Sequence, residues 1–404
     1  MHQFASRLIT AAVFSSILFG LASCSGSKGT LPNLPSSAGV VHKSDTTGVT
    51  VSPSSLNFTA TGPANSQKFV ASTPFDGTIG AVSSDVTVAT VDPASAETPK
   101  NQGDYRKSVI FTVTPVGQGT CTITVTDTKG NQASVSVSVA IGKPLFVANE
   151  TSNKVTEYAS PYTGAPIATI SNSVNHPQGL AFDASGDLFV ANYTKANVTE
   201  YAPPYTGAPT ATISNSVSFP QGLAFDASGD LFVANAVGQG PNGYVTEYAP
   251  PYTGAPIATI TNSVGVDVVG LAFDASGDLF VANSNNNNVT EYAPPYTGAP
   301  TATISNSVSD PFGLAFDASG DLFVANISPD YVTEYASPYT GAPIATLTNS
   351  LNGPFGLAFD ASGDLFIANN GQNNVTEYAP PFTGAPIATI SNKVRHPSFL
   401  AFGP

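Results

Sequence analysis

An internal repeat fills residues 143–404 and constrains the fold of this chain more than any other feature. Copies of the pentapeptide LFVAN, one of them LFIAN, begin at Leu145, Leu188, Leu231, Leu279, Leu322 and Leu365. They are 43 residues apart, except for one interval of 48. Each unit has four short apolar segments (GLAF, LFVAN, VTEYA and ATI or ATL) separated by turn residues. Four strands in a unit of this length are typical of a β-propeller blade.

The phase of the repeat predicts a closed ring. The first copy opens at the second strand of a blade, at Leu145, and the chain ends with an unaccompanied first strand around Leu400. If this last strand pairs beside the first LFVAN, the two ends share one blade and no sheet edge stays open. Six first strands then match six second strands, which predicts six blades. An open solenoid with both ends uncapped is the alternative.

Residues 48–142 follow a different period. In TCTITVT (120–126) and SVSVSV (134–139), apolar residues alternate strictly with polar ones. This pattern predicts strands with one buried face, as in a β-sandwich. Cys121 falls on the inward side, where we expect a small core residue rather than a reactive thiol. The stretches VTVSPSSLNFTATG and SSDVTVATVDP resemble bacterial Ig-like domains of the group-two type, which are spacers in surface proteins.

The first residues predict export. Residues 1–23 combine Arg7 with an apolar stretch, which is typical of a signal peptide. They end in Leu21-Ala22-Ser23 followed by Cys24, which resembles the lipobox of bacterial lipoproteins. The resemblance implies a lipidated Cys24 in the membrane and a place in the cell envelope, at the outer membrane or cell surface. An ordinary signal peptide with a coincidental cysteine is the alternative. Residues 24–47, rich in Ser, Gly and Pro, predict a flexible tether.

The run P-x-G-L-A-F-D-x-x-G-D-L-F-V-A-N resembles NHL-repeat and gluconolactonase-like six-bladed propellers over the whole repeat region. The resemblance implies the fold; activity in this family depends on individual sites. Its enzymes hold a divalent cation with one Glu, two Asn-type ligands and one Asp from different blades. This sequence has no single Glu near one first strand. Asp267 and Asp310 are the candidate metal ligands, with Asn283 or Asn326, and the cofactor they would hold is Ca²⁺.

Composition excludes several other functions. The chain has 13 basic and 27 acidic residues, and its net charge of -14 repels phosphate backbones, so we expect no nucleic-acid partner. With two Cys and four His, the chain has few side chains that could carry out thiol chemistry or bind a soft metal. Catalytic motifs such as G-x-S-x-G and H-E-x-x-H are missing from the sequence. We therefore predict no catalytic residues and, apart from the Ca²⁺ alternative, no cofactor.

Residues that recur nearly invariantly from blade to blade are interpreted as architecture. DASGD suits a tight turn in which Asp caps the backbone and Gly takes a positive φ, although it also resembles part of an acidic calcium loop. The second strands end in an Asn that can bond the backbone of the following loop. A catalytic acid is needed once, so a Glu in each VTEYA is also structural. These glutamates are Glu157, Glu200, Glu247, Glu291, Glu334 and Glu377.

Residues that differ between blades are the better ligand-binding candidates, because an asymmetric ligand requires an asymmetric site. They lie in the fourth-to-first connections and second-to-third loops, which share one face of a propeller, the face opposite DASGD. The candidates are His176, Tyr193, Phe219, Tyr244, Asp267, Asp310, Tyr331, Arg395 and His396. Sequence drift in solvated loops is the alternative explanation for these differences. His176 and His396 could act as an acid–base or metal-binding pair, but histidines in exposed loops usually have no such role.

These observations predict a lipid-anchored envelope protein that presents a propeller as a non-enzymatic module for a protein, glycan or small ligand. A metal-dependent hydrolase or lactonase is the first alternative. A purely structural surface module is the second.

Overall fold

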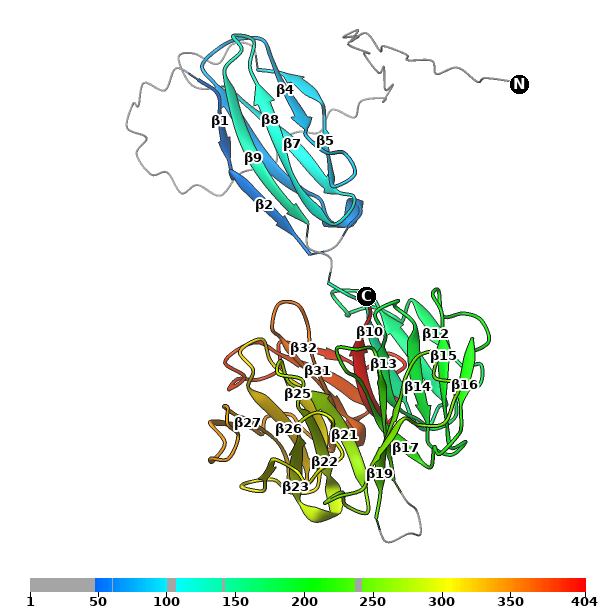
Figure 1. Cartoon of the computed structure of the whole chain (residues 1–404). Helices are drawn as coiled ribbons and strands as arrows, with labels where there is room; N and C mark the ends of the chain where they lie inside the picture. The colour runs from blue at the N-terminus through cyan, green and yellow to red at the C-terminus, as the bar shows by residue number, and fades with distance from the viewer. Residues whose placement is uncertain (1–47, 60, 100–106, 140–141, 237–241) are drawn as a thin grey trace, which may run out of the picture. The chain divides into compact units, whose positions relative to one another are not determined.

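The computed structural model describes residues 48–59, 61–99, 107–139, 142–236 and 242–404 (Figure 1). The predicted signal peptide, Cys24 and the tether lie outside these ranges. Almost all regular structure is β, with three short 3₁₀ turns, η1 (Pro63–Asn65), η2 (Ser284–Asn286) and η3 (Asn370–Gln372). Within the described ranges, no helix has the length and apolar character needed to cross a membrane. The predicted all-β fold class is confirmed.

The first folded part is a sandwich of two sheets. One has the order β1 (Thr50–Ser52), β3 (Gln67–Thr73), β7 (Lys107–Pro115), β5 (Ala89–Asp92). The other has the order β2 (Ser55–Phe58), β9 (Gln132–Val139), β8 (Gly119–Thr126), β4 (Thr78–Ser83), β6 (Ser95–Glu97). The alternating apolar residues form the core between the sheets, where Phe69 and Phe111 stack at 5.3 Å. Cys121 lies in this core with 7% of its surface exposed, as the alternation predicts.

The second folded part is a ring of six four-stranded antiparallel sheets, the predicted blades. The innermost strands are β13 (Pro177–Phe182), β17 (Pro220–Phe225), β21 (Val268–Phe273), β25 (Pro311–Phe316), β29 (Pro354–Phe359) and β33 (Pro397–Phe402). The second strands are β10 (Leu145–Asn149), β14 (Leu188–Asn192), β18 (Leu231–Asn235), β22 (Leu279–Asn283), β26 (Leu322–Ile327) and β30 (Leu365–Asn369).

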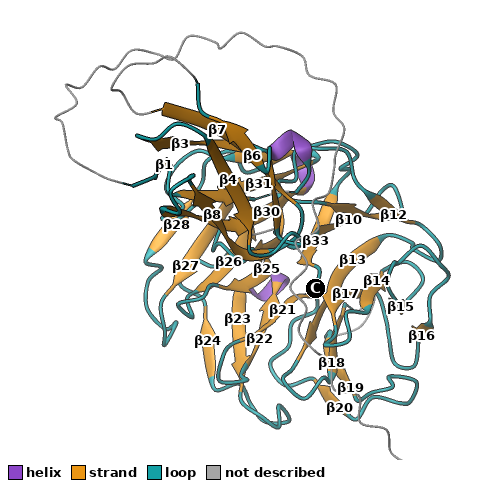
Figure 2. Ribbon diagram, turned by 90° about the horizontal axis from the view of Figure 1, so that it is seen from above, coloured by secondary structure: helices purple, strands orange, loops and turns teal. Residues whose placement is uncertain are grey.

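The third strands of the blades are β11 (Lys154–Tyr158), β15 (Asn197–Tyr201), β19 (Tyr244–Tyr248), β23 (Asn288–Tyr292), β27 (Asp330–Tyr335) and β31 (Asn374–Tyr378). The fourth are β12 (Ala168–Ile170), β16 (Ala211–Ile213), β20 (Ala258–Ile260), β24 (Ala302–Ile304), β28 (Ala345–Leu347) and β32 (Ala388–Ile390). Figure 2 shows β13, β17, β21, β25 and β33 nearest the centre of the ring, with β16, β20, β24 and β28 outside.

The two ends of the repeat region share one blade, which confirms the predicted closure. Its strand order is β12-β11-β10-β33, and Leu145 pairs with Phe402 and Val147 with Leu400. The Ser398 hydroxyl of β33 also donates a hydrogen bond to the Pro177 carbonyl of β13, at 2.8 Å. The last strand therefore completes one sheet and joins the next blade, so the ring has no open seam.

Adjacent blades are held by repeated aromatic contacts. Phe189 of β14 packs edge-on against Phe225 of β17 and against Tyr252, with ring centroids 5.0 and 5.2 Å apart. The Tyr at the end of each third strand is almost fully buried, and its hydroxyl donates to a carbonyl of the connection that enters its blade. Tyr201, for example, bonds the Asn172 carbonyl at 2.6 Å. Tyr and Phe thus supply both apolar area and a directed bond.

The glycine in each P-x-G of the innermost strands is required by close approach of backbones. A Cβ built on Gly222 would overlap the carbonyl oxygen of Val269 in the neighbouring strand, and the same holds for Gly179, Gly270 and Gly313. Five of the six innermost strands therefore have glycine at this position, and β33, which has Phe399 there, is the exception.

Gly222→Ala should lower the free energy of unfolding by about 1–3 kcal/mol, because the backbone of Val269 must move to admit a methyl group. Gly254→Ala is the matched control, since no atom lies within 4 Å of a Cβ there. Chemical denaturation of both variants measures the difference. Equal stability of the two would show that the innermost strands are not in contact.

Candidate functional site

The variable residues of the propeller meet at one end of the ring, here called the mouth. Each innermost strand is preceded by one mouth residue: His176, Phe219, Asp267, Asp310, Gly353 and His396. The repeated Asn of each second strand is followed by another: Glu150, Tyr193, Ala236, Ser284, Ile327 and Asn370. Backbone hydrogen bonds join the two sets blade by blade, as from the Tyr193 nitrogen to the His176 carbonyl at 3.2 Å.

The recurring Asn at the end of each second strand fixes the mouth to the sheet. Asn192 is fully buried; its amide donates to Thr199 on the next strand at 2.9 Å, and its oxygen accepts from the Asn175 backbone nitrogen at 2.8 Å. The expected bond to the following loop is therefore wrong. The Asn bonds the preceding connection instead, because that connection crosses the end of the second strand before entering β13. The interpretation as architecture rather than chemistry is consistent with these contacts.

A second set of bonds links neighbouring blades. The oxygen of Asn153 accepts from the His176 backbone nitrogen at 2.7 Å, and Asn287 holds the Asp310 nitrogen in the same way at 2.7 Å. His176 and Asp310 have φ values of 46° and 50°, in the left-handed region that non-glycine residues rarely adopt. Each mouth residue of this kind is thus kept in a strained backbone conformation by a side chain of the adjacent blade.

One side of the mouth is acidic. Asp267 and Asp310 lie on adjacent blades, and Asp310 accepts a hydrogen bond from the Ser284 hydroxyl. Asp267 accepts one from the Asn285 amide at 2.8 Å. Neither aspartate belongs to a group of three close acidic, His or Cys ligand atoms in the described part of the chain. A Ca²⁺ site at this pair stays a prediction, and the structure shows two hydrogen-bonded carboxylates on one edge.

The side across the ring carries the histidines. His176 lies 3.8 Å from the Glu150 carboxylate, measured from Nδ1, and His396 shares a hydrogen bond with Thr151 at 3.1 Å. Asn370 donates to the other oxygen of Glu150 at 3.4 Å. The two histidines lie on neighbouring blades, as expected from ring closure.

An aromatic pair lies between these two sides. The rings of Tyr193 and Phe219 are 5.1 Å apart and tilted by 49°, and 36% of Phe219 is exposed. Burial raises the pKa of the Tyr193 hydroxyl, with further contributions from the charges of Asp267 and Glu150. Tyr193 therefore stays a neutral donor near both carboxylates.

The innermost strands continue the asymmetry below the mouth. The second residues of the innermost strands are Gln178, Gln221, Val269, Phe312, Phe355 and Ser398. Phe312 and Phe355 stack with ring centroids 4.2 Å apart. Gln178 is 6% exposed, and its side-chain oxygen has no hydrogen-bond partner among the described residues. One half of the ring therefore offers aromatic surface and the other offers amides.

Three of the predicted candidates are not at the mouth. Tyr244 and Tyr331 lie at the starts of third strands, as the first residue of β19 and the second of β27, and their hydroxyls donate to the backbone carbonyls of Ser216 and Ser307 at 3.3 and 3.2 Å. They brace the connection against the blade. Arg395 precedes His396 but lines a pocket beside β11. His176, Tyr193, Phe219, Asp267, Asp310 and His396 are the candidates that the fold brings together.

Sequence reasoning missed Glu150, Ser284 and Asn370 as site residues. Each follows the repeated Asn of a second strand, and each bonds a side chain or backbone atom of a mouth residue from another connection. Their shared offset from LFVAN was the available signal. The 43-residue register places them at one level of the ring, whereas the loops as a whole differ in length.

The opposite face carries the DASGD turns, which behave as predicted. The Asp226 carboxylate accepts from the backbone nitrogens of Ser228 and Asp230 at 2.9 and 2.8 Å, and Gly229 has φ 85°. Three copies bring both Asp carboxylates within 4.8 Å of the third-strand Glu: Asp226, Asp230 and Glu247; Asp317, Asp321 and Glu334; Asp360, Asp364 and Glu377. Burial and the charges of Asp364 and Asp360 raise the pKa of Glu377 to about 7.

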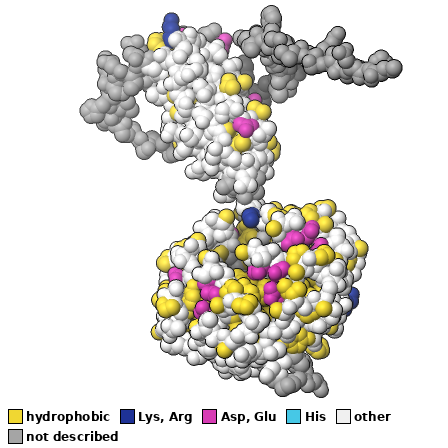
Figure 3. Space-filling view, in the orientation of Figure 1, with side chains coloured by type: hydrophobic (Ala, Val, Ile, Leu, Met, Phe, Trp, Pro, Cys, Tyr) yellow, Lys and Arg dark blue, Asp and Glu magenta, His cyan; other side chains and the backbone are white. Residues whose placement is uncertain are grey.

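These carboxylate groups are hard oxygen donors of the type that Ca²⁺ prefers. Their geometry follows from the turn and from the blade repeat. Figure 3 shows Asp and Glu side chains gathered among hydrophobic ones on the visible face of the propeller. The electrostatic potential around these Asp and Glu side chains is therefore negative, in agreement with the net charge of -14.

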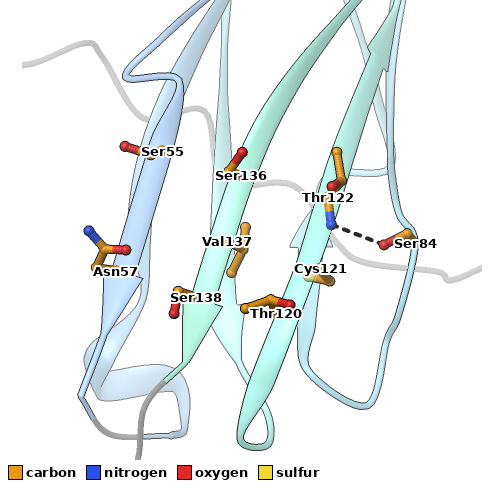
Figure 4. Close-up of a pocket in the computed structure, with 9 residues that line it drawn as sticks. All are labelled: Ser55, Asn57, Ser84, Thr120, Cys121, Thr122, Ser136, Val137 and Ser138. Atoms are coloured by element: carbon orange, nitrogen blue, oxygen red, sulfur yellow. Dashed lines mark hydrogen bonds between the residues drawn. The ribbon is translucent and has the colours of Figure 1, made fainter.

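The sandwich has a hollow of about 330 Å³ on its second sheet (Figure 4). It is lined by Ser55, Asn57, Ser84, Thr120, Cys121, Thr122, Ser136, Val137 and Ser138. Most of these side chains are hydroxyls from the polar positions of the alternating strands. The backbone nitrogen of Thr122 donates to the Ser84 hydroxyl at 3.0 Å. The hollow has no charged side chain, and it reflects the outer face of a sheet rather than a built site.

Comparison with known proteins identifies the fold but no family. No family model and no curated protein matches the chain. Among solved structures 613 chains match. One is the crystal structure of a protein of unknown function from Bacteroides caccae, 16% identical, with a TM-score of 0.53; the match covers 64% of this chain and 98% of that chain. At this identity the likeness is one of fold alone.

The buried Asn clamps yield a testable prediction. Asn326→Leu removes the bonds to Thr333 and Val324 and leaves the Ser309 backbone nitrogen without its acceptor. We expect a loss of about 1–3 kcal/mol in the free energy of unfolding. The control Asn306→Ala changes an exposed residue and should stay within about 0.5 kcal/mol of the parent. If Asn326→Leu were as stable as the control, the clamp would not hold the connection.

Proposed function

We propose that this chain is a lipid-anchored cell-envelope protein whose propeller binds a ligand at the mouth without catalysing a reaction. The observation that carries the proposal is the chemical asymmetry of the mouth in an otherwise repetitive ring. Asp267 and Asp310 lie on one side and His176 and His396 across from them, with the Tyr193–Phe219 pair between. Strained backbone fixed by side-chain clamps gives these residues defined positions.

The chemistry of the mouth fits a hydroxyl-rich ligand such as a glycan. Carboxylates and amides accept and donate hydrogen bonds to hydroxyl groups, and exposed aromatic rings pack against the C–H faces of sugar rings. The acidic edge and the overall negative charge disfavour an anionic polymer. A neutral or cationic glycan is therefore the ligand class that these residues support.

The anchor and the spacer complete the proposal. The lipobox-like run before Cys24 supports attachment to the membrane. Two or three acyl chains on this cysteine would hold the protein stably in the membrane, whereas one chain binds only marginally. The sandwich of residues 50–139 would serve as the spacer that its resemblance to Ig-like domains suggests, and the ring would be a propeller of the NHL-like type. Both family resemblances rest on the sequence motifs.

The anchor is tested by metabolic labelling with palmitate. The full chain, expressed in a Gram-negative host, should incorporate label and partition into the detergent phase of Triton X-114. The Cys24→Ser variant should do neither, because the acylated sulfur is missing. Cys121→Ser is the control, since Cys121 is buried in the sandwich core. Labelling that persisted in Cys24→Ser would rule out the lipobox.

Ligand binding is tested on the Cys24→Ser chain, screened against an array of bacterial and host glycans and then titrated calorimetrically with the best binder. Tyr193→Ala and Asp267→Asn should each weaken binding about tenfold or more, which corresponds to about 1.4 kcal/mol. Tyr244→Phe is the control, because Tyr244 lies outside the mouth. Unchanged affinity in both mouth variants, or no binder on the array, would contradict the proposal.

The same Cys24→Ser chain distinguishes ligand binding from the two alternative functions, a metal-dependent lactonase and a purely structural module. A metal-dependent lactonase requires a stoichiometric cation and lactone turnover that both disappear in Asp267→Ala/Asp310→Ala. A purely structural module requires neither turnover nor any ligand. The mouth carboxylates already accept hydrogen bonds from Ser284 and Asn285, which argues against the metal-dependent alternative.

A further inference from the structure

A pocket at the junction of the first and last repeats concentrates positive charge on an otherwise acidic ring. It has a volume of about 340 Å³, and it is lined by Lys154, Lys393 and Arg395 with Ser152, Thr156 and Thr169. The whole chain has only 13 basic residues against 27 acidic ones. In the described part of the chain, none of these three cations has a carboxylate within ion-pair distance. No ion pair with a described residue therefore offsets their mutual repulsion.

The strand geometry explains why these side chains converge. Lys154 and Thr156 are two residues apart on β11 and share a face, and Thr169 of β12 lies directly opposite Thr156. Thr156 is 2% exposed and accepts a bond from Asn149 at 2.9 Å, so the floor of the pocket is rigid.

The remaining wall comes from the other end of the repeat region. Lys393 and Arg395 are also two residues apart, in the connection that enters β33. The Tyr158 hydroxyl holds this connection at the Asn392 carbonyl, at 2.6 Å, and Asn149 holds the Arg395 backbone nitrogen at 2.8 Å. The pocket therefore exists only because β33 closes the ring beside β10.

The other blades lack this combination of charges. In the next blade the positions of Lys154, Lys393 and Arg395 are occupied by Asn197, Ser173 and Asn175. The same fold thus forms with neutral residues, so the blade architecture does not require the three cations. That blade carries one lysine, Lys195, near the Ser173 carbonyl.

We propose that this pocket binds a tetrahedral oxyanion, a phosphate or sulfate group. Arg and Lys supply charge-assisted donors, and the Thr169 hydroxyl supplies a neutral one, which is the type of donor set such groups accept. The site is separate from the mouth, and it does not depend on the function proposed there. Because its walls come from both ends of the repeat region, a bound oxyanion links the first repeat to the last and stabilises the closed ring.

The test compares the Cys24→Ser chain with a triple variant, Lys154→Asn/Lys393→Ser/Arg395→Asn, which installs the residues of the next blade. Inorganic phosphate should raise the melting temperature of the parent by about 2–4 °C at a saturating concentration, relative to sodium chloride at equal ionic strength. The triple variant should lose this shift and bind phosphate at least about tenfold more weakly by calorimetry. Lys195→Gln is the control and should keep both responses.

A second arm identifies the source of the oxyanion. Vesicles of phosphatidylglycerol that retain the parent chain but not the triple variant indicate a lipid headgroup, whereas a response to inorganic phosphate without vesicle binding indicates a soluble phosphate. Both results support the site. The proposal is overturned if phosphate and sulfate leave the parent unchanged, or if the triple variant responds as the parent does. The circular dichroism spectrum of the triple variant establishes that it is folded.

Discussion

Pairing of the last strand, β33, with β10 is the interaction on which the rest of the propeller depends. It joins residues more than two hundred positions apart in the sequence, and it removes the exposed edges that an open array of sheets would leave. The same strand reaches the neighbouring blade through Ser398. Both proposed binding surfaces follow from this closure: the two histidines of the mouth become neighbours, and the connection with Lys393 and Arg395 comes to lie over β11.

Repetition and departure from repetition have different physical roles in this molecule. The residues that recur satisfy needs shared between blades: the buried Asn holds a connection, the Tyr joins two blades, and in five of the six innermost strands glycine lets the backbones touch. A ring built from these residues alone would be nearly symmetric and would present the same surface six times. The residues that differ, at the mouth and in the pocket of the closing blade, are therefore where selective binding can arise.

The distribution of charge separates three surfaces of the propeller. The DASGD face is acidic because each turn contains two aspartates, of which the first caps the backbone, and the third strand adds a glutamate. The mouth combines acidic and histidine edges, and the closing blade holds the cluster of Lys154, Lys393 and Arg395. On the DASGD face, burial and the neighbouring carboxylates of Asp364 and Asp360 raise the pKa of Glu377 to about 7, because the crowded negative charges repel one another.

The sequence by itself determined the blade count, the closure and the DASGD turns, because the 43-residue period and its phase depend on local strand and turn chemistry. It also placed Cys121 in a sandwich core, since alternation specifies which face is buried. Only the tertiary structure decided which variable residues meet. Tyr244, Tyr331 and Arg395 lie away from the mouth, Glu150 and Asn370 lie at it, and the repeated Asn bonds the preceding connection rather than the following loop. The reason is that convergence depends on strand register and on the rotation between blades, which no single repeat encodes.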